Sequence, residues 1–344
     1  MRDGTGGMPA RPDARYRPMK VGIIGTGFGG RVVAGAFQAG GCEVTDVVTA
    51  RDHSAVRTLC RSDVDLISVH SPPFLHRDHV AMALEAGRAV LCDKPFGRSL
   101  EEAEAMAGQA DESGLVNLVN FEFRHQPARQ TMHALVTSGA IGRPLHLAYT
   151  AFTSGSRVPL RPWGWLFDRS LGGGWIGAFG SHAIDLVRWL LGEVSSAGAA
   201  TWITVTERPD GTGKLVRCDA EDAFTGWVAL ESGATATVDS SFTAGVTTPA
   251  RITVTGTEGT LENVGDVRVV LRRRGEELRN LEFDRAAGDG HHQAMVAWAG
   301  VIRDAVNGGV KITPSFADGV ACMRVMEQWR TLPPVPVGDG RGPA

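Results

Sequence analysis

The sequence predicts an α/β fold whose N-terminal part is a doubly wound parallel sheet. Short runs rich in β-branched residues, such as KVGII at 20–24, alternate with segments of helical spacing. A turn with the spacing G-x-G-x-x-G stands directly between the first predicted strand and the first predicted helix. A chain of 344 residues is also long enough for two domains of ordinary size.

The composition is typical of a globular protein, with 43% hydrophobic and 21% charged residues and a formal net charge of -3. This balance gives no electrostatic reason to expect nucleic acid or a membrane as a partner. The five scattered cysteines include no C-x-x-C pair and predict buried free thiols in a cytoplasmic protein. The N-terminus has no apolar segment typical of a secretory signal, and we expect residues 1–18 and 333–344 to be tails.

The glycine turn predicts a site for the pyrophosphate of a dinucleotide. Gly25 would permit the tight turn, Gly27 would let the backbone approach the pyrophosphate, and Gly30 would let helix and strand pack closely. The helix that follows offers free N–H groups to the anion. A turn that binds nothing is the alternative, which the flanking strand and helix disfavour. The predicted cofactor-binding residues of this turn are Gly25, Thr26, Gly27, Phe28, Gly29 and Gly30.

The end of the second predicted strand, residues 43–49, bears on the choice between NADP and NAD. It lacks the acidic residue that holds the ribose 2′-hydroxyl in NAD-binding units. Arg51 stands next to it, and a guanidinium suits the 2′-phosphate of NADP. The sequence therefore favours NADP. NAD stays open, since Asp52 could hold the ribose if the loop were shifted by one residue.

The next two strand ends are expected at the same edge of the sheet as the glycine turn. The third predicted strand is followed by Ser71 and Pro72, and the fourth by Asp93 and Lys94. Ligands of doubly wound sheets bind beyond the carboxyl ends of the strands. These four residues are therefore predicted to line the cofactor cleft, with Lys94 at the nicotinamide end.

His76 and His79 begin the helix after this turn. A pair of histidines three residues apart, without a third ligand, does not predict a metal site, and we expect none. We expect a solvated helix start with the ring of His76 near the cofactor.

Three segments together resemble the glucose–fructose oxidoreductase / inositol dehydrogenase (Gfo/Idh/MocA) family. They are VGIIGTGFGG at 21–30, LCDKPFG at 91–97 and LGGGWIGAFGSHAIDLVRWLLG at 171–192. The second resembles the family's Glu-Lys-Pro signature, with Asp93 in place of the glutamate. The third resembles its G-x-H-x-x-D segment. The resemblance extends over about residues 20–330.

The resemblance implies an N-terminal Rossmann domain, expected at 19–121, and a C-terminal α+β domain with an open, mostly antiparallel sheet, expected at 122–332. It implies an NAD(P)-dependent enzyme that interconverts a hydroxyl and a carbonyl on a sugar-like or cyclitol substrate. It also implies a homo-oligomer, either a dimer or a tetramer. In the family pattern, Lys94 would contact the reacting oxygen and the cofactor ribose, and His182 would act as acid or base.

Two departures from the family pattern stand out. The stretch between Arg51 and Asp65 has room for about one short helix, where the family usually has a helix and a small strand. Ala178 stands four residues before His182, where the family often has Asp. If that Asp tunes or orients the histidine, then water, the substrate or Asp185 could compensate here.

The chemistry of alcohol oxidation gives the predicted catalytic residues their roles. A cation must stabilise the developing alkoxide, and a base must take the hydroxyl proton. Lys94 can supply the cation, and His182 is the natural base because imidazole titrates near neutral pH. Asp185 would share a helix face with His182 and would orient it or bind a substrate hydroxyl. A core or helix-capping role is the alternative for His182.

Candidate substrate-binding residues come from three places in addition to His182. Arg161, Trp163 and Trp165 lie in a loop, and aromatic faces beside polar groups suit sugar rings. Packing of both tryptophans under the loop is an equal alternative. Arg124 follows the strand that leaves the first domain, and His291 precedes a late helical segment, so both could line the cleft.

Two other functions remain compatible with the same fold. One is a redox-neutral enzyme that retains a tightly bound NAD(P). The other is a regulatory protein that senses NADP without catalysis. The pair Lys94 and His182 favours an enzyme, because a sensor has no need of it.

Overall fold

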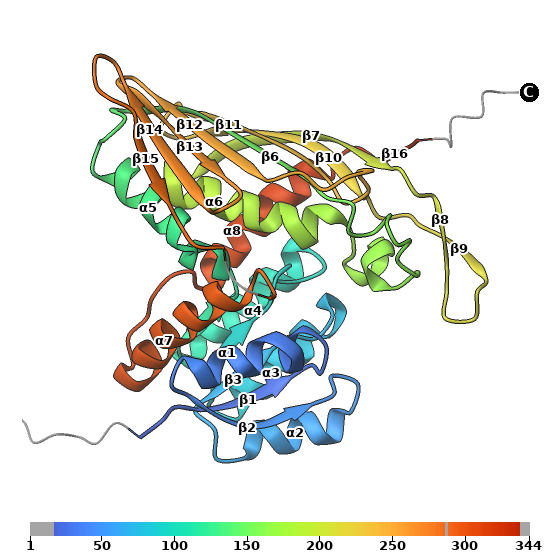
Figure 1. Ribbon diagram of the computed structural model, residues 1–344. Helices are drawn as coiled ribbons and strands as arrows, with labels where there is room; N and C mark the ends of the chain where they lie inside the picture. The colour runs from blue at the N-terminus through green and yellow to red at the C-terminus, as the bar shows by residue number, and fades with distance from the viewer. Residues whose placement is uncertain (1–16, 286–287, 338–344) are drawn as a thin grey trace, which may run out of the picture.

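The structure, a computed structural model, describes residues 17–285 and 288–337 and contains two large sheets with helices between and around them (Figure 1). The smaller sheet has five strands, all parallel. They are β1 (Lys20–Ile24), β2 (Glu43–Val48), β3 (Leu66–Val69), β4 (Ala89–Cys92) and β5 (Asn117–Val119). Its connecting helices are α1 (Ala34–Ala39), α2 (His53–Arg61), α3 (His76–Glu85) and α4 (Leu100–Ser113).

The strand order β2-β1-β3-β4-β5 places the ligand crevice of this sheet. The chain runs outward from β1 to β2 and then crosses back to β3, so the order reverses between β1 and β3. In open parallel sheets, ligands bind at such a switch point, beyond the carboxyl ends of the strands. The predicted short helix after Arg51 is α2, and it leads directly to β3.

Both faces of the parallel sheet are covered by helices. One face packs against α1 and α7 (His292–Gly308), where Phe37 and Trp298 meet Val21 and Ile23 of β1. The other face packs against α2, α3 and α4. α7 comes from the late part of the chain, so a segment far from the first 121 residues completes the cover of this sheet.

The larger sheet has nine strands and is mostly antiparallel, in the order β15-β14-β13-β12-β6-β11-β10-β7-β16. The parallel pairs are β6 with β11 and β7 with β16. Its strands are β6 (Pro144–Phe152), β7 (Val194–Ile203), β10 (Ala223–Leu230), β11 (Thr235–Ser241), β12 (Arg251–Gly256), β13 (Gly259–Val264), β14 (Arg268–Arg273), β15 (Arg279–Glu282) and β16 (Val335–Pro336).

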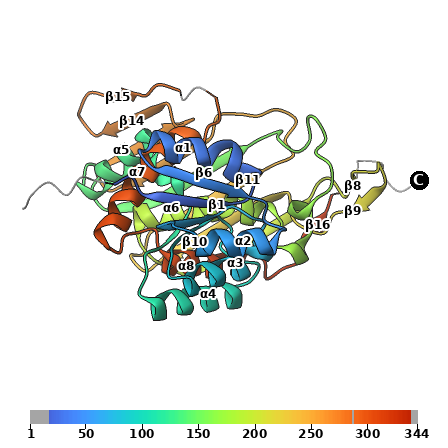
Figure 2. The ribbon, with the colours of Figure 1, turned by 90° about the horizontal axis from the view of Figure 1, so that it is seen from below.

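Helices α5 (Pro127–Thr137), α6 (Ser181–Leu191) and α8 (Phe316–Trp329) lie between the two sheets (Figure 1). They cover one face of the nine-stranded sheet and leave the other open. Figure 2 shows α8 beside α4, and these two helices pack together where the halves of the molecule meet. A small hairpin, β8 (Glu207–Pro209) with β9 (Leu215–Arg217), projects from the end of the large sheet (Figure 1).

This architecture confirms the predicted fold class, and it differs from the sequence-based expectations in two places. The strand expected through NLVNFEF ends at Val119, and residues Glu122–His125 form a single turn of 3-10 helix, η3. Val335 and Pro336 pair with β7, although the sequence predicted a tail there. Residues 1–16 and 338–344 of the predicted tails lie outside the described residues. The five cysteines all lie within the described ranges and are buried and unpaired, as predicted.

Within residues 17–285 and 288–337, no helix is both long enough and apolar enough to cross a membrane.

The packing of α7 gives a first testable prediction. Trp298 is fully buried against the parallel sheet, so Trp298→Ala should lower the free energy of unfolding by about 3–5 kcal/mol. Val301 lies on the same helix with 41% of its surface exposed, and Val301→Ala should change stability by less than about 0.5 kcal/mol. Urea denaturation followed by circular dichroism measures both. Equal effects of the two substitutions would contradict this packing.

Candidate active site

A cleft of ≈ 520 Å³ lies beyond the carboxyl ends of β1, β3 and β4. Nine of the predicted cofactor-binding residues line it: Gly25, Thr26, Gly27, Phe28, Arg51, Ser71, Pro72, Asp93 and Lys94. The strand order explains this grouping, because the segments that follow β1, β2, β3 and β4 all begin at one edge of the sheet.

The glycine turn has the shape that a dinucleotide pyrophosphate needs. Gly25 has a φ of +120°, and a Cβ there would lie 2.5 Å from the carbonyl oxygen of His70. The space beside Gly27 is open, so a ligand can approach the backbone closely. The close packing of helix on strand occurs at Gly29, where a Cβ would lie 2.9 Å from Ile23. This corrects the expectation for Gly30, whose nearest neighbour in the same test, Val47, would be at an ordinary 3.5 Å.

Three arginines line the same cleft: Arg31, Arg51 and Arg161. Burial, together with the nearby positive charge of Arg31, lowers the pKa of Arg161. A bound pyrophosphate or phosphate would neutralise such a cluster. The carboxylate of Asp52 caps α2 by accepting hydrogen bonds from the backbone of Ser54 and Ala55, at 3.0 Å each. The residues present therefore fit a phosphate-bearing dinucleotide.

The structure places His76 beneath the cleft, in contrast to the expectation that it lines it. The His76 side chain is fully buried, and its Nε2 lies 2.8 Å from the carbonyl oxygen of Ser71. His79, also buried, contacts the Ser71 hydroxyl through Nδ1 at 3.0 Å. The two rings therefore support the Ser71–Pro72 turn from inside the protein.

Asp93 acts as the anchor of the strand end that presents Lys94. Its carboxylate lies 3.3 Å from Nδ1 of His70 and accepts hydrogen bonds from the Asn120 side chain and the Lys94 backbone. Burial disfavours the charged carboxylate, but the hydrogen bond to His70 and the charges of His70 and Lys94 outweigh it and hold the pKa of Asp93 below its usual range. Lys94 follows directly after this anchored residue and lines the cleft.

A second cavity of ≈ 500 Å³ adjoins the first, and seven of its lining residues are aromatic, so we call it the aromatic cavity. Four residues line both cavities: Lys94, Arg161, Trp165 and His291. The aromatic residues that line the second cavity are Phe123, Tyr149, Phe152, Trp165, Trp175, Phe179 and Phe242. Lys94 therefore lies where the cofactor cleft meets an aromatic cavity of suitable size for a small molecule.

His182 lines the aromatic cavity from α6. Burial lowers the pKa of His182 well below its usual value, and the positive charges of Lys94, His291 and Arg129 lower it further. His182 is therefore neutral near pH 7 and able to accept a proton. The Lys94 ammonium reaches the same helical segment and donates a hydrogen bond to the carbonyl oxygen of Ala178 at 2.9 Å.

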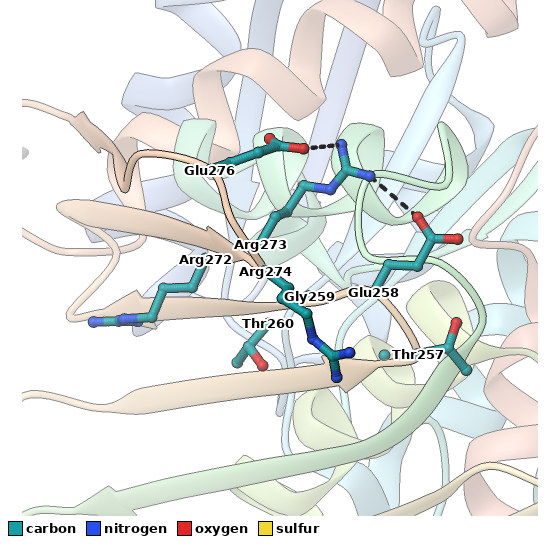
Figure 3. A pocket seen from close by; sticks show the side chains of 9 residues that line it. Thr257, Glu258, Gly259, Thr260, Arg272, Arg273, Arg274 and Glu276 are labelled. Carbon is teal, nitrogen blue, oxygen red and sulfur yellow. Dashed lines mark hydrogen bonds and ion pairs between the residues drawn. The ribbon is translucent and has the colours of Figure 1, made fainter.

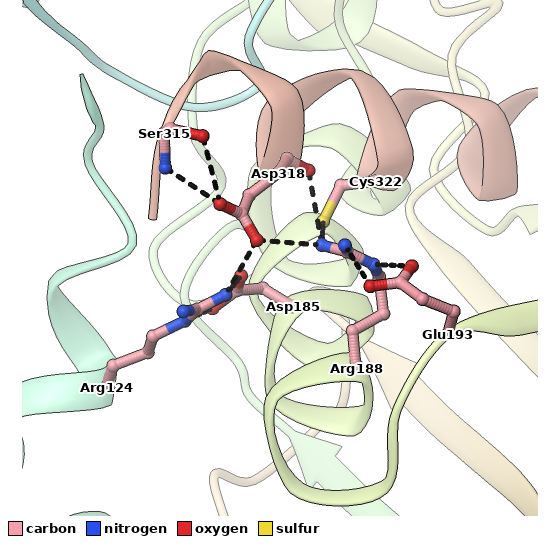
Figure 4. A network of polar contacts seen from close by, with 7 residues as sticks. All are labelled: Arg124, Asp185, Arg188, Glu193, Ser315, Asp318 and Cys322. Atoms are coloured by element: carbon pink, nitrogen blue, oxygen red, sulfur yellow. Dashed lines mark hydrogen bonds and ion pairs between the residues drawn. The ribbon is translucent and has the colours of Figure 1, made fainter. Parts of the chain in front are cut away.

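Asp185 and Arg124 pair with each other, and this corrects their expected roles beside His182 and the substrate. Both carboxylate oxygens of Asp185 accept hydrogen bonds from Arg124, at 2.6 and 2.8 Å. Figure 4 shows that Asp318 of α8 also faces Arg124, and that Arg188 joins Asp318 to Glu193. Neither Arg124 nor Asp185 lines either cavity within the part of the chain that the structure describes.

The pair has a structural consequence for the site. Arg124 belongs to η3 and Asp185 to α6, and both side chains are almost completely buried. Breaking a buried ion pair is costly, so the two segments are held in a fixed relative position. Glu122 lies on η3 and His182 on α6. The Arg124–Asp185 ion pair therefore fixes the distance between Glu122 and His182.

The two loop tryptophans differ in position. Trp165 lines both cavities, whereas Trp163 packs with Leu166, Phe167 and Ile203. Trp165 packs against the same cluster, so the equal alternative of packing under the loop describes both tryptophans, and Trp165 lines the cavities in addition. Arg208 supports this loop from a fully buried position by donating to the carbonyl oxygens of Ser156 and Arg161.

Several residues of the site were missed by sequence reasoning: Arg31, His70, Glu122, Arg129 and Tyr149. Arg31 follows the glycine turn and His70 ends β3, so their positions at the cleft edge were readable from the sequence. Glu122, Arg129 and Tyr149 come from different elements. Only the tertiary packing brings Arg129 and Tyr149 to the second cavity and the buried Glu122 beside His182 and His291.

A further cavity of ≈ 580 Å³ lies away from this site, where the β12–β13 turn meets the end of β14. Figure 3 shows Arg273 between Glu258 and Glu276, and its guanidinium pairs with them at 3.1 and 3.0 Å. The cavity shares no lining residue with the cofactor cleft or the aromatic cavity. Its charges are largely paired within the protein, and we assign it no ligand.

The parallel sheet, the glycine turn and the adjoining cavity with Lys94 and His182 define a dinucleotide-binding oxidoreductase. Comparison with known proteins identifies the family. Residues 19–121 match the model of the oxidoreductase family with an NAD-binding Rossmann fold, and residues 129–262 match that of the GFO/IDH/MocA C-terminal domain. The chain belongs to the Gfo/Idh/MocA family, as the sequence motifs predicted, and is an NAD(P)-dependent oxidoreductase.

Named relatives include dehydrogenases of sugars and cyclitols. Levoglucosan dehydrogenase of Pseudarthrobacter phenanthrenivorans is 28% identical over 291 residues, which cover 75% of each chain. The scyllo-inositol 2-dehydrogenase (NAD(+)) of Bacillus subtilis is 29% identical over 199 residues, covering 58% of this chain and 54% of that one. A solved structure of levoglucosan dehydrogenase with NADH and levoglucosan has the same fold, with a TM-score of 0.82 at 24% identity over 91% of this chain and 96% of the other.

The burial of His79 predicts a pH dependence of stability. Burial lowers its pKa to about 4, with further contributions from His76 and His53, whereas the unfolded chain titrates near 6.5. Between these values the unfolded chain binds more protons, so stability must fall as the pH drops. The contribution from His79 alone is about 2 kcal/mol between pH 7 and pH 5.

His79→Gln should remove this part of the slope, and the change at the exposed His53 should remove only the smaller part that its charge contributes to the shift of His79. Urea denaturation at pH 7 and pH 5 measures the difference. Identical slopes for wild type and His79→Gln would show that His79 titrates alike in the folded and unfolded chain.

Proposed function

We propose that this protein interconverts a hydroxyl and a carbonyl group on a sugar-like or cyclitol substrate, using a nicotinamide dinucleotide. The observation that carries the proposal is the position of Lys94, which lines both the cofactor cleft and the aromatic cavity beside His182. The names of the relatives, which include levoglucosan and scyllo-inositol dehydrogenases, support this substrate class.

In this proposal, two side chains do the chemistry at the substrate. The bound nicotinamide accepts or supplies the hydride. Lys94 places a positive charge where the substrate oxygen becomes negative, and its hydrogen bond to Ala178 holds the ammonium in place. His182 is neutral and takes the hydroxyl proton when the alcohol is oxidised, or returns it in the reverse direction.

The lining of the second cavity supports a ring-shaped polar substrate. Trp175 stacks on Phe242 with ring centroids 4.1 Å apart and on Phe179 at 5.3 Å, and all three line the cavity and give it an apolar wall. The C–H face of a sugar or cyclitol suits such a wall. Hydroxyl groups of the substrate would find donors in Arg161 and His291 at the junction with the cofactor cleft.

We propose NADP as the preferred cofactor, although the named relatives include proteins with NADH or NAD(+). Arg51 lines the cleft beyond β2, where the ribose of the adenosine is expected. The alternative residue, Asp52, uses its carboxylate to cap α2. The proposal therefore rests on a cation near the 2′ position and on a competing acid that is already engaged.

We also propose that residues 19–121 hold the cofactor and 122–332 shape the substrate cavity and an oligomer contact. The open face of the nine-stranded sheet presents Trp227, which is 50% exposed. A homodimer or homotetramer formed through this face would cover it, and sedimentation analysis would report the mass.

Substitution of Lys94 tests the enzymatic proposal. Lys94→Ala should lower kcat by roughly 10³-fold with the best substrate, while the affinity for NADPH changes by less than about threefold. The first panel of substrates is levoglucosan, scyllo-inositol and D-apiose, each with NADP⁺ or NAD⁺. The absorbance of the reduced cofactor measures turnover. If the wild type retained bound cofactor through purification and showed no net change in it, a redox-neutral reaction would replace this proposal. Cofactor binding without turnover of any kind would favour a sensor.

Substitution of Arg51 tests the cofactor preference. Arg51→Gln should weaken NADPH binding by about ten- to a hundredfold, because a phosphate loses its charged partner, and should leave NADH binding within about threefold. Titration of wild type and variant by cofactor fluorescence measures both. The matched change Arg57→Gln, on the exposed side of α2, should alter neither affinity. A wild type that prefers NADH would refute the role given to Arg51.

A further inference from the structure

The active-site segment lacks an acidic side chain where the family often has one. Ala178 stands at that position, and its backbone carbonyl holds Lys94. Its methyl group cannot carry the negative charge that would balance a protonated His182. Lys94 and Arg129 lie close enough to His182 to disfavour its protonation, so some other anion is needed when the proton arrives.

Glu122 is a buried carboxylate beside His182. Its side chain is 0% exposed, and its Oε1 accepts a hydrogen bond from Nδ1 of His291 at 2.6 Å. The same Oε1 lies 3.9 Å from Nε2 of His182. Within the described part of the chain, Oε2 of Glu122 and Nε2 of His182 are both buried without a hydrogen-bond partner. A buried carboxylate with an unused oxygen thus adjoins a buried imidazole with an unused nitrogen.

We propose that Glu122 is the positioning residue that takes the place of the missing acid: held by His291, its carboxylate orients His182 and stabilises the imidazolium formed during the reaction. This inference rests on the proposed function. One proton moves in the step, as the substrate O–H bond breaks and an N–H bond forms on His182. The two electrons leave with the hydride to the oxidised cofactor, and Glu122 stays ionised throughout.

The charges around His182 support this assignment. The positive groups that face it are Lys94 and Arg129. Arg129 is neutralised by Asp266, with an Nη2–Oδ2 distance of 2.9 Å, and so Asp266 is engaged elsewhere. Glu122 is left as the carboxylate that approaches the His182 ring. A separation of 3.9 Å is long for a hydrogen bond, and such contacts commonly shorten when the substrate binds.

The buried pair Arg124–Asp185 explains how this geometry is held. Arg124 lies two residues after Glu122, and Asp185 lies three residues after His182. Phe123 lies between Glu122 and Arg124 on η3. Its ring stacks on the His291 ring with centroids 4.8 Å apart, and its centroid lies 4.4 Å from that of the His182 ring. Backbone and ring contacts therefore fix both histidines relative to Glu122.

The test removes the negative charge of Glu122 and then supplies a negative charge near His182 from a different side chain. Glu122→Gln keeps the size of the side chain and should lower kcat by roughly 10²-fold or more, with KM and the affinities for NADPH and NADH within about threefold. Adding Ala178→Asp to this variant should recover at least about tenfold, because it restores an anion near His182. Formate should likewise raise the rate of Glu122→Ala. A structural role alone would produce neither recovery.

The controls separate this inference from the proposed function. Glu102 lies on α4, and its largely buried carboxylate pairs with Arg98. Glu102→Gln removes this carboxylate and should leave kcat unchanged. Cofactor fluorescence and the midpoint of thermal unfolding report binding and folding without turnover. If Glu122→Gln does not fold, His291→Gln, at a residue 33% exposed, should lower kcat about tenfold for the same reason.

Three results would overturn the inference in different ways. If the folded Glu122→Gln variant has the kcat of the wild type, the role of Glu122 is refuted and the proposed function is not. A loss of kcat that neither Ala178→Asp nor formate repairs has the same meaning. A wild type that binds cofactor but turns over no compound in the panel refutes the proposed function, and the inference with it.

Discussion

The arrangement of the candidate site depends on one buried ion pair, between Arg124 and Asp185. Their bidentate contact joins the turn after the parallel sheet to the helix that carries His182. Asp318 approaches the same guanidinium from α8, so three elements converge on one cation (Figure 4). Because a buried charge without its partner is strongly unfavourable, these elements cannot drift apart without a large loss of stability. The active-site distances between η3 and α6 follow from this constraint.

Helix α7 links the two halves of the molecule in a second way. Its residues Met295 and Trp298 complete the core of the parallel sheet, and His291 at its start reaches the junction of the two cavities. His291 also bonds to Glu122 of η3. The core packing against the parallel sheet therefore positions a side chain at the aromatic cavity. Substitutions in the α7 core are expected to disturb this junction as well as stability.

Electrostatics divide the site into two regions with different demands. The cofactor cleft gathers arginines, which suit phosphate groups at the surface. The aromatic cavity surrounds His182 with burial and positive charge, which keeps the imidazole neutral and ready to accept a proton. A neutral base in such surroundings needs an anion nearby as it becomes charged. In our proposal Glu122 meets this need from η3, whereas the family pattern has its acid at the position of Ala178 on η6.

The fold class, the glycine turn and the strand-end residues of the cleft were predictable from the sequence. These features are local, since a strand, a turn and a helix follow one another directly and parallel strands all end at one edge. Hydrophobic periodicity and motif spacing in the sequence predict such local features. They placed Ser71, Asp93 and Lys94 correctly at the cleft.

The contacts between side chains around His182, in contrast, depend on how distant segments pack in three dimensions. The spacing of His182 and Asp185 suggested partners on one helix face, but Arg124 takes both oxygens of Asp185. His76 turned inward, and Glu122 came to lie beside two histidines from elements 60 and 169 residues away. Long-range pairing of this kind depends on helix packing and on the burial of charges, and no local pattern in a single sequence records either.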